Sequence, residues 1–172
     1  MLRLVVLFIV VLVPMLVEAR RAARNERAQR AQGGIEPRHD VYPFMQVAYP
    51  GVFLAMLAEG LFRPPPPLTV VAAGAVIFLI GKALKWWAIV TLGQFWTFRV
   101  IVVPGSQLVT AGPYRYVRHP NYVGVLGELA GAALVSGAVV AGPLGTALFA
   151  ALMGVRIQVE NRAIRRLTNS PR

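Results

Sequence analysis

The chain alternates between long apolar runs and short polar connectors. Apolar residues dominate Met1–Val17, Tyr42–Phe62, Leu68–Leu92, Val123–Ala141 and Leu144–Val155. A transmembrane helix needs about 20 predominantly apolar residues. The pattern therefore predicts an all-α, polytopic membrane protein with about five transmembrane helices.

The last two apolar segments are short. Joined by Gly142-Pro143, they hold about 33 residues, fewer than two full spans require. We expect a tight C-terminal helical hairpin that is tilted or reaches only part of the way across the bilayer. Small residues in this stretch allow close helix contact. They are Gly127, Gly131, Ala132, Ser136, Gly137, Gly145, Ala150 and Gly154.

The connectors in the first half also carry structural signals. Residues 20–40 are polar and rich in Ala, Arg and Gln, which predicts a helix that ends near Gly33-Gly34. The run Pro64–Pro67 cannot lie inside a helix and predicts a stiff extended turn. Val17-Glu18-Ala19 would pass as a signal-peptide cleavage site. We prefer an uncleaved first span because its start carries little charge and a basic cluster follows directly. Near the end of the third span, Lys82 and Lys85 can snorkel to the headgroups.

Composition agrees with a membrane location, and charge gives an orientation. The 172 residues are 56% hydrophobic and 15% charged, with a net charge of +11. The positive charges adjoin apolar runs, which favours membrane orientation and argues against nucleic acid as a partner. With the N-terminus outside, the basic stretches Arg20–Arg38, Lys82–Arg118 and Arg156–Arg172 all lie on the cytoplasmic side, and only Arg3 and Arg63 lie outside. We therefore expect a multi-pass protein of the cytoplasmic membrane, and its oligomeric state stays open.

A polar, turn-rich insert precedes the fourth apolar segment. It runs from Gly112 to Gly124 and holds two Arg, three Tyr and one His. Such an insert is costly in a membrane protein unless it lines a cavity or an interface. Pro120 disfavours helix at His119 and suits the first turn of a helix. We expect Arg118–Tyr122 to form a helix N-terminus at the cytoplasmic surface, where free N–H groups favour a carboxylate. Each aromatic or basic side chain taken singly also fits a simple interfacial anchor.

A second polar pair lies on the last predicted helix, just after its apolar run. Arg156 and Glu160 are four residues apart and so share one face of a helix. The simplest interpretation is an ion pair within that helix. In the functional interpretation, this face turns toward Arg118–Tyr122, because a helical hairpin returns its end to the side where it began. Glu160 would then receive a ligand's ammonium group and Arg156 a substrate carboxylate.

These motifs together resemble a known family. Leu108-Val109-Thr110-x-Gly112-Pro113-Tyr114-Arg115, then Arg118-His119-Pro120-Asn121-Tyr122-Val123-Gly124, then Arg156-x-x-x-Glu160 resemble the isoprenylcysteine carboxyl methyltransferase family, which is near the phospholipid methyltransferases. The resemblance covers roughly residues 86–167. It implies S-adenosylmethionine held at the cytoplasmic face and a lipophilic acceptor entering from the bilayer. The length of the chain allows one domain over residues 1–172, and we expect three spans and a connector in 1–92 and a cofactor-binding catalytic core in 93–172.

The resemblance assigns site residues by position. Arg156 would orient the acceptor as the catalytic residue, and Glu160 would bind the amino group of the cofactor. The other cofactor-binding positions are Arg99, Ser106, Gln107, Leu108, Val109, Tyr114, His119, Pro120, Asn121 and Tyr122. Three features depart from the family pattern: Arg99 replaces the Gln of some members, Asn161 stands where a second acid is common, and the chain stops at Arg172, before the usual aromatic, basic tail.

The expected reaction is transfer of a methyl group from S-adenosylmethionine to a carboxylate or enol oxygen of a lipophilic acceptor. The cofactor supplies the electrophile, so the protein needs to align the reactants and exclude water. An acceptor that is already anionic needs no strong base, which agrees with the scarcity of acidic residues. Without Cys and with two His, the chain predicts no metal site. Phospholipid N-methylation is an alternative, although an amine gains little from Arg156, and a non-catalytic membrane scaffold or subunit with the same fold is another.

Overall fold

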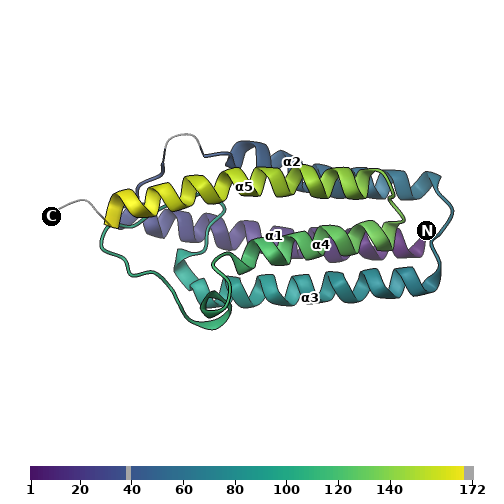
Figure 1. Cartoon of the computed structure of the whole chain (residues 1–172), viewed down its shortest axis with the longest axis horizontal. Helices are drawn as coiled ribbons and strands as arrows, with labels where there is room; N and C mark the ends of the chain where they lie inside the picture. Colours follow the sequence, from purple (N-terminus) through teal and green to yellow (C-terminus); the bar gives the residue numbers. More distant parts are fainter. Residues whose placement is uncertain (38–39, 169–172) are drawn as a thin grey trace.

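The computed structural model describes residues 1–37 and 40–168. Arg38 and the tail beyond Thr168 lie outside this part of the chain. The described residues form five long helices that run up and down side by side in one elongated bundle (Figure 1). They are α1 (Leu2–Ala31), α2 (Tyr42–Phe62), α3 (Leu68–Leu92), α4 (Pro120–Ser136) and α5 (Ala141–Thr168). The predicted all-α membrane fold is confirmed.

The lengths of the helices decide which of them can span a bilayer. Four helices are long and apolar enough to do so by length and composition: α1, α2, α3 extended to Phe95, and α5. α4 has 17 residues and is shorter than a full span. The expectation of a short last segment was wrong for α5, which continues for 28 residues through Arg156 and Glu160. Pro143 lies in the first turn of α5, where Pro is tolerated, and Gly137 at a φ of 75° ends α4.

α1 joins the first apolar run and the basic connector in one continuous helix. It ends at Ala31, and Gly33 follows with a φ of 77°, as predicted. Polar side chains from its second half reach the chain just after α3. Asn25 Nδ2 donates to the carbonyls of Gly93 and Trp96 at 2.9 and 2.7 Å, and Gln29 Nε2 donates to Gln94 O at 2.9 Å. These bonds hold the second half of α1 against the chain that follows α3.

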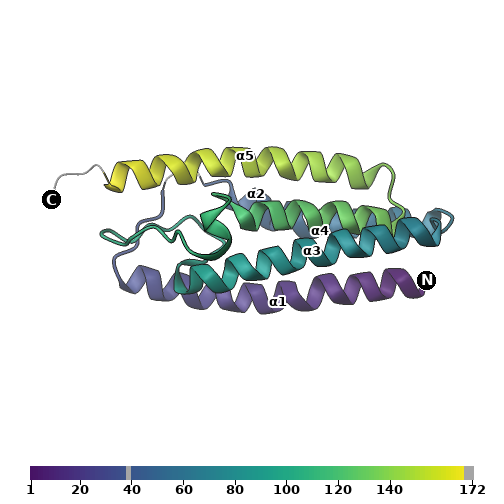
Figure 2. The ribbon, with the colours of Figure 1, turned by 60° about the horizontal axis from the view of Figure 1, so that its bottom comes forward.

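Glycines bring α3 and α4 unusually close together. A Cβ on Gly81 would lie 2.7 Å from the carbonyl oxygen of Gly124, and one on Gly131 would lie 2.5 Å from the backbone nitrogen of Phe78. Such distances leave no room for a side chain, so the two backbones are in direct contact. The small residues of α4 thus allow the close helix contact that was expected. Besides those with α3, α4 has equally close contacts with α2 and α5, where a Cβ on Gly60 or Gly142 would lie 2.5 Å from Ser136 O or Ala133 Cβ. Figure 2 shows α3 and α4 side by side beneath α5.

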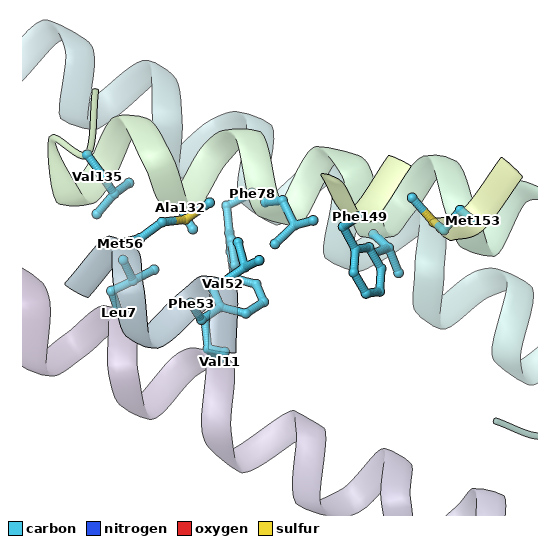
Figure 3. Packing of buried hydrophobic residues seen from close by; sticks show 13 residues of the cluster. Leu7, Val11, Val52, Phe53, Met56, Phe78, Ala132, Val135, Phe149 and Met153 are labelled. Atoms are coloured by element: carbon cyan, nitrogen blue, oxygen red, sulfur yellow. The ribbon is translucent and has the colours of Figure 1, made fainter. Parts of the chain in front are cut away.

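The core and the surface of the bundle are both apolar. All five helices contribute to one buried cluster (Figure 3), which includes Leu7, Val11, Phe53, Met56, Phe78, Val135, Phe149 and Met153. Large apolar side chains are also exposed along the helices, among them Phe8, Leu54, Leu79 and Leu148. An apolar surface of this extent suits contact with lipid tails, because a soluble protein rarely exposes one.

A charged network lies inside the bundle between the first four helices. Lys85 Nζ lies 2.7 Å from Glu18 Oε2 and 3.1 Å from Glu128 Oε2, and Lys82 Nζ lies 2.8 Å from Glu128 Oε1. Tyr49 donates a hydrogen bond to Glu128 and accepts one from Lys85 at 3.3 Å. The snorkelling expected of the two lysines was wrong, because buried carboxylates from α1 and α4 hold them inside.

Candidate active site

The predicted polar corner forms at the N-terminus of α4. η2 (Gly112–Arg115) and a short turn lead into this helix. His119 is the N-cap, with a non-helical φ of −129° and ψ of 62°, and Pro120 is the first helical residue. This geometry follows from the restrictions that proline places on itself and on the residue before it. The corner lies at the end of the bundle where α5 also ends (Figure 1).

α5 turns its polar face toward this corner. Tyr122 Oη donates to Glu160 Oε2 at 3.1 Å and accepts from Arg156 Nε at 2.9 Å. His119 Nδ1 lies 3.8 Å from Glu160 Oε2, and its ring stacks on that of Tyr122 with centroids 5.4 Å apart. The structure thus brings together His119, Tyr122, Arg156 and Glu160, which are separated by up to 41 positions in sequence.

Arg156 is buried and joins three parts of the chain. Besides Tyr122, it donates through Nη1 to Asp40 Oδ1 at 3.2 Å and to the backbone carbonyl of Phe98 through Nη2. The Asp40 carboxylate also accepts the backbone N–H groups of Tyr42 and Val100. A buried guanidinium requires such partners, because an unpaired buried charge is strongly unfavourable. Arg156 therefore links α5 to α4, to the α1–α2 connector through Asp40, and to the α3–α4 connector through Phe98.

Arg99 lies beside this group and makes a different set of contacts. Its Nη1 lies 2.7 Å from Glu36 Oε1, and its guanidinium stacks over the ring of Tyr42 at 4.9 Å. Partial burial acts to raise the pKa of Glu36, but hydrogen bonds from Arg99 and Arg30 outweigh it, so the pKa is lowered. In this arrangement Arg99 holds the α1–α2 connector against the segment that follows α3.

Tyr114 in η2 is the next aromatic group near the corner. Burial raises its pKa to about 12, and the negative charge of Glu160 adds to the increase. The hydroxyl therefore stays protonated at neutral pH and can act as a hydrogen-bond donor.

Two buried polar atoms at this corner have no partner in the described part of the chain. They are Nε2 of His119 and Oδ1 of Asn121. Buried polar groups nearly always form hydrogen bonds, so these two atoms have bonding capacity left for a ligand. His119 also lies beside the Glu160 carboxylate, whose side chain is 31% exposed and offers a negative charge to a positively charged ligand group.

The cofactor positions that the resemblance assigns at residues 106–109 lie in the loop before η2. Ser106, Gln107 and Leu108 are exposed, Val109 is half-buried, and the Ser106 hydroxyl donates to Val103 O within its own loop. In both views this loop extends past the start of α4, in the direction of the C-terminal end of α5 (Figures 1 and 2).

Sequence reasoning missed Asp40. The available signal was local: an Asp directly before an apolar helix with Pro near its start is a typical capping residue. Its contact with Arg156 spans 116 positions and needs the folded bundle to be seen.

Comparison with known proteins identifies the family of this chain. A model of the isoprenylcysteine carboxyl methyltransferase (ICMT) family matches residues 74–166. The uncharacterized protein YpbQ of Bacillus subtilis is 34% identical over 143 residues, which cover 83% of this chain and 85% of YpbQ. An uncharacterized protein of Haemophilus influenzae is 26% identical over 145 residues, 84% of each chain. No solved structure matches the chain significantly.

The chain belongs to the isoprenylcysteine carboxyl methyltransferase family, as its motifs predicted. Its fold and its family together define a membrane methyltransferase. The matched region begins within α3, so α1, α2 and Asp40 lie outside it.

Proposed function

We propose that the protein uses S-adenosylmethionine to methylate a carboxylate or enol oxygen of a lipophilic acceptor at the cytoplasmic face of the membrane. The observation that carries this proposal is the meeting of His119 with the Glu160 carboxylate at the start of α4, where two buried polar atoms, His119 Nε2 and Asn121 Oδ1, lack partners among the described residues. These atoms offer polar partners and a counter-charge to an amino acid moiety such as that of the cofactor. Family membership supports the same reaction class.

The residues at the start of α4 would hold the cofactor. Glu160 would pair with its ammonium group, and the free N–H groups at the start of α4 would favour its carboxylate. The rings of Tyr114 and Tyr122 would bound its adenosine or face its sulfonium. Arg99, Ser106, Gln107, Leu108, Val109 and Pro120 complete the proposed cofactor-binding set. When bound, the cofactor supplies an electrophilic methyl group.

The protein's own contribution would be positioning and the exclusion of water. Arg156, held by Tyr122, would present a fixed positive charge to the acceptor oxygen. An apolar groove between α2 and α5, lined by Val47, Gly51, Gly145 and Leu148, supports the view that the acceptor carries an alkyl chain. The alkyl chain of the acceptor would remain in this groove while the polar end of the acceptor reaches Arg156.

The proposed orientation places the N-terminus outside. The C-terminal ends of α1, α3 and α5 meet at one end of the bundle, and the polar corner lies there (Figure 1). Most arginines of the chain belong to the segments at this end, which the positive-inside rule assigns to the cytoplasm.

The test is methyl transfer and cofactor binding by the purified protein in lipid nanodiscs. With methyl-labelled S-adenosylmethionine and a membrane lipid extract, we expect label in a lipid product whose methyl group is released by ester or enol ether hydrolysis. His119→Ala should weaken binding of S-adenosylhomocysteine by about 10-fold or more, because hydrogen bonds to charged or buried partners contribute about 1.5–3 kcal/mol.

Two results would point elsewhere. Label in methylated phosphatidylethanolamine would identify the N-methyltransferase alternative. A folded protein that binds neither S-adenosylmethionine nor S-adenosylhomocysteine would support a non-catalytic scaffold instead.

A further inference from the structure

The guanidinium that would receive an acceptor carboxylate already holds one from its own chain. Nη1 of Arg156 lies 3.2 Å from Oδ1 and 3.4 Å from Oδ2 of Asp40. The other faces of the guanidinium meet Tyr122 and the carbonyl of Phe98. Each nitrogen of Arg156 thus has a partner, and an anionic acceptor that took the place of Asp40 would need to displace it.

Asp40 is built into this position. Its side chain is 5% exposed, and that of Arg156 is 7% exposed. Oδ1 accepts the N–H of Tyr42 at 3.2 Å and Oδ2 accepts the N–H of Val100 at 3.1 Å. These two bonds fix the carboxylate between α2 and the segment after α3, so the ion pair with Arg156 is part of the folded structure.

The charges of the site decide which acceptor it favours. Asp40 and Glu160 carry two negative charges against the positive charge of Arg156, and Arg99 beside them is paired with Glu36, which leaves one negative charge in excess. The cofactor carries one net positive charge and balances this excess. A carboxylate acceptor would add a negative charge with no free counter-ion in a nearly buried place, which is strongly unfavourable.

We propose that Asp40 determines the acceptor class: the site methylates an uncharged hydroxyl group, an enol or a phenol, and Asp40 takes up its proton. This inference rests on the proposed function and narrows its acceptor. The longer contact, between Nη1 and Oδ2, is the one that the acceptor hydroxyl replaces. As the proton moves to Asp40, the counter-ion of Arg156 changes from Asp40 to the acceptor oxygen.

The step conserves atoms and charge. The O–H bond of the acceptor breaks and its proton passes to the Asp40 carboxylate. A lone pair of the acceptor oxygen forms the new bond to the methyl carbon, and the electron pair of the broken methyl–sulfur bond stays on sulfur. The pocket has the same total charge before and after transfer, because the lost sulfonium charge is replaced by the proton on Asp40.

The experiment uses two probes that differ only in the acceptor group, 4-dodecylphenol and 4-dodecylbenzoate, with the whole protein in nanodiscs. For the wild-type protein we expect methyl transfer to the phenol with a kcat/KM at least about 10-fold above that for the benzoate. This comparison needs no variant. Preference for the benzoate, or no methylation of the phenol by protein that binds the cofactor, would overturn the proposal.

Asp40→Asn separates proton transfer from a structural role. Its amide keeps an oxygen for one backbone N–H but cannot take a proton. We expect its rate with the phenol to fall by about 100-fold, within the usual range for a lost general base. The remaining rate should rise about 10-fold per pH unit toward the ionisation of the phenol, whereas the wild-type rate should be nearly flat above pH 7. Parallel pH profiles would contradict the role of Asp40.

Equilibrium binding gives a readout that does not depend on turnover. Without its internal competitor, Arg156 in Asp40→Asn should bind 4-dodecylbenzoate about 10-fold more tightly than in the wild type, with 4-dodecylphenol changed less than about 2-fold. Glu36→Gln is the matched control, because Glu36 lies on the same connector but pairs with Arg99 and Arg30. Glu36→Gln should leave the ratio of the affinities for 4-dodecylbenzoate and 4-dodecylphenol unchanged. A wild-type protein that does not bind S-adenosylmethionine would refute the proposed function itself. Unchanged binding of 4-dodecylbenzoate in Asp40→Asn would refute this inference alone.

Discussion

Removing one lysine from the buried charged network should destabilise the bundle strongly. Lys85 and Lys82 are the only lysines of the chain, and both belong to this network. Lys85→Met removes an ammonium that lies 2.7 Å from Glu18 and 3.1 Å from Glu128. Two buried carboxylates then share Lys82 alone. Breaking a buried ion pair from one side costs about 3–5 kcal/mol, and we expect a loss of that size in the free energy of unfolding.

The double variant Glu18→Gln with Lys85→Met tests the electrostatic origin of this loss. It removes one charge of each sign and keeps the contact between Lys82 and Glu128 at 2.8 Å. Because no uncompensated charge remains, we expect it to be more stable than the Lys85→Met protein by about 1–3 kcal/mol, the usual size of coupling between groups in contact.

The assay is reversible unfolding in mixed micelles, with sodium dodecyl sulfate as the denaturant and far-UV circular dichroism as the signal. Arg63→Met is the control, since its pair with Glu59 is exposed to solvent and should contribute little to stability. A Lys85→Met protein within about 1 kcal/mol of the control would refute the reasoning. The reasoning would also be refuted if the loss of stability in the double variant equalled the sum of the losses in Glu18→Gln and Lys85→Met.

Three further outcomes follow from the same structure. Gly81→Ala should lower the free energy of unfolding by about 1–3 kcal/mol, since its Cβ would lie 2.7 Å from Gly124 O, while Gly154→Ala, with nothing within 4 Å, should change it little in the same assay. Tyr122→Phe removes the hydroxyl between Arg156 and Glu160 and should weaken S-adenosylhomocysteine binding by about 5–10-fold in isothermal titration, with an unchanged helix content. The lowered pKa of Glu36 means that its ion pairs stabilise the connector above its ordinary pKa of 4.5 and are lost as the pH falls below that value. Hydrogen exchange of residues 32–37 should therefore become faster relative to the core as the pH falls from 5 to 3. If these residues were protected equally in Glu36→Gln and in the wild-type protein at pH 6, this prediction would be contradicted.

The sequence predicted the parts of the fold that depend on local pattern. The apolar runs identified the helices, Gly33 marked the end of α1, and Pro120 marked the start of α4. The spacing of Arg156 and Glu160 placed both on one helix face, and the hairpin argument correctly turned that face toward Tyr122.

Other features depend on contacts that no local pattern encodes. Lys85 looked like an interfacial lysine because its partners, Glu18 and Glu128, lie 67 and 43 positions away. Asp40 looked like part of a polar connector, although it holds Arg156. The apolar run that ends at Val155 is too short to span a bilayer, whereas α5 is long enough because it continues through Arg156, which is buried among polar partners.

The most direct test of the central claim is cofactor binding to the purified protein in nanodiscs, measured by isothermal titration with S-adenosylmethionine. We expect one site per chain, weakened about 10-fold or more by Glu160→Gln and unchanged by Glu59→Gln, whose carboxylate caps the other end of α5 through Ala141 N–H. Absence of binding, or equal affinity in the Glu160→Gln and Glu59→Gln proteins, would contradict a cofactor site between α4 and α5.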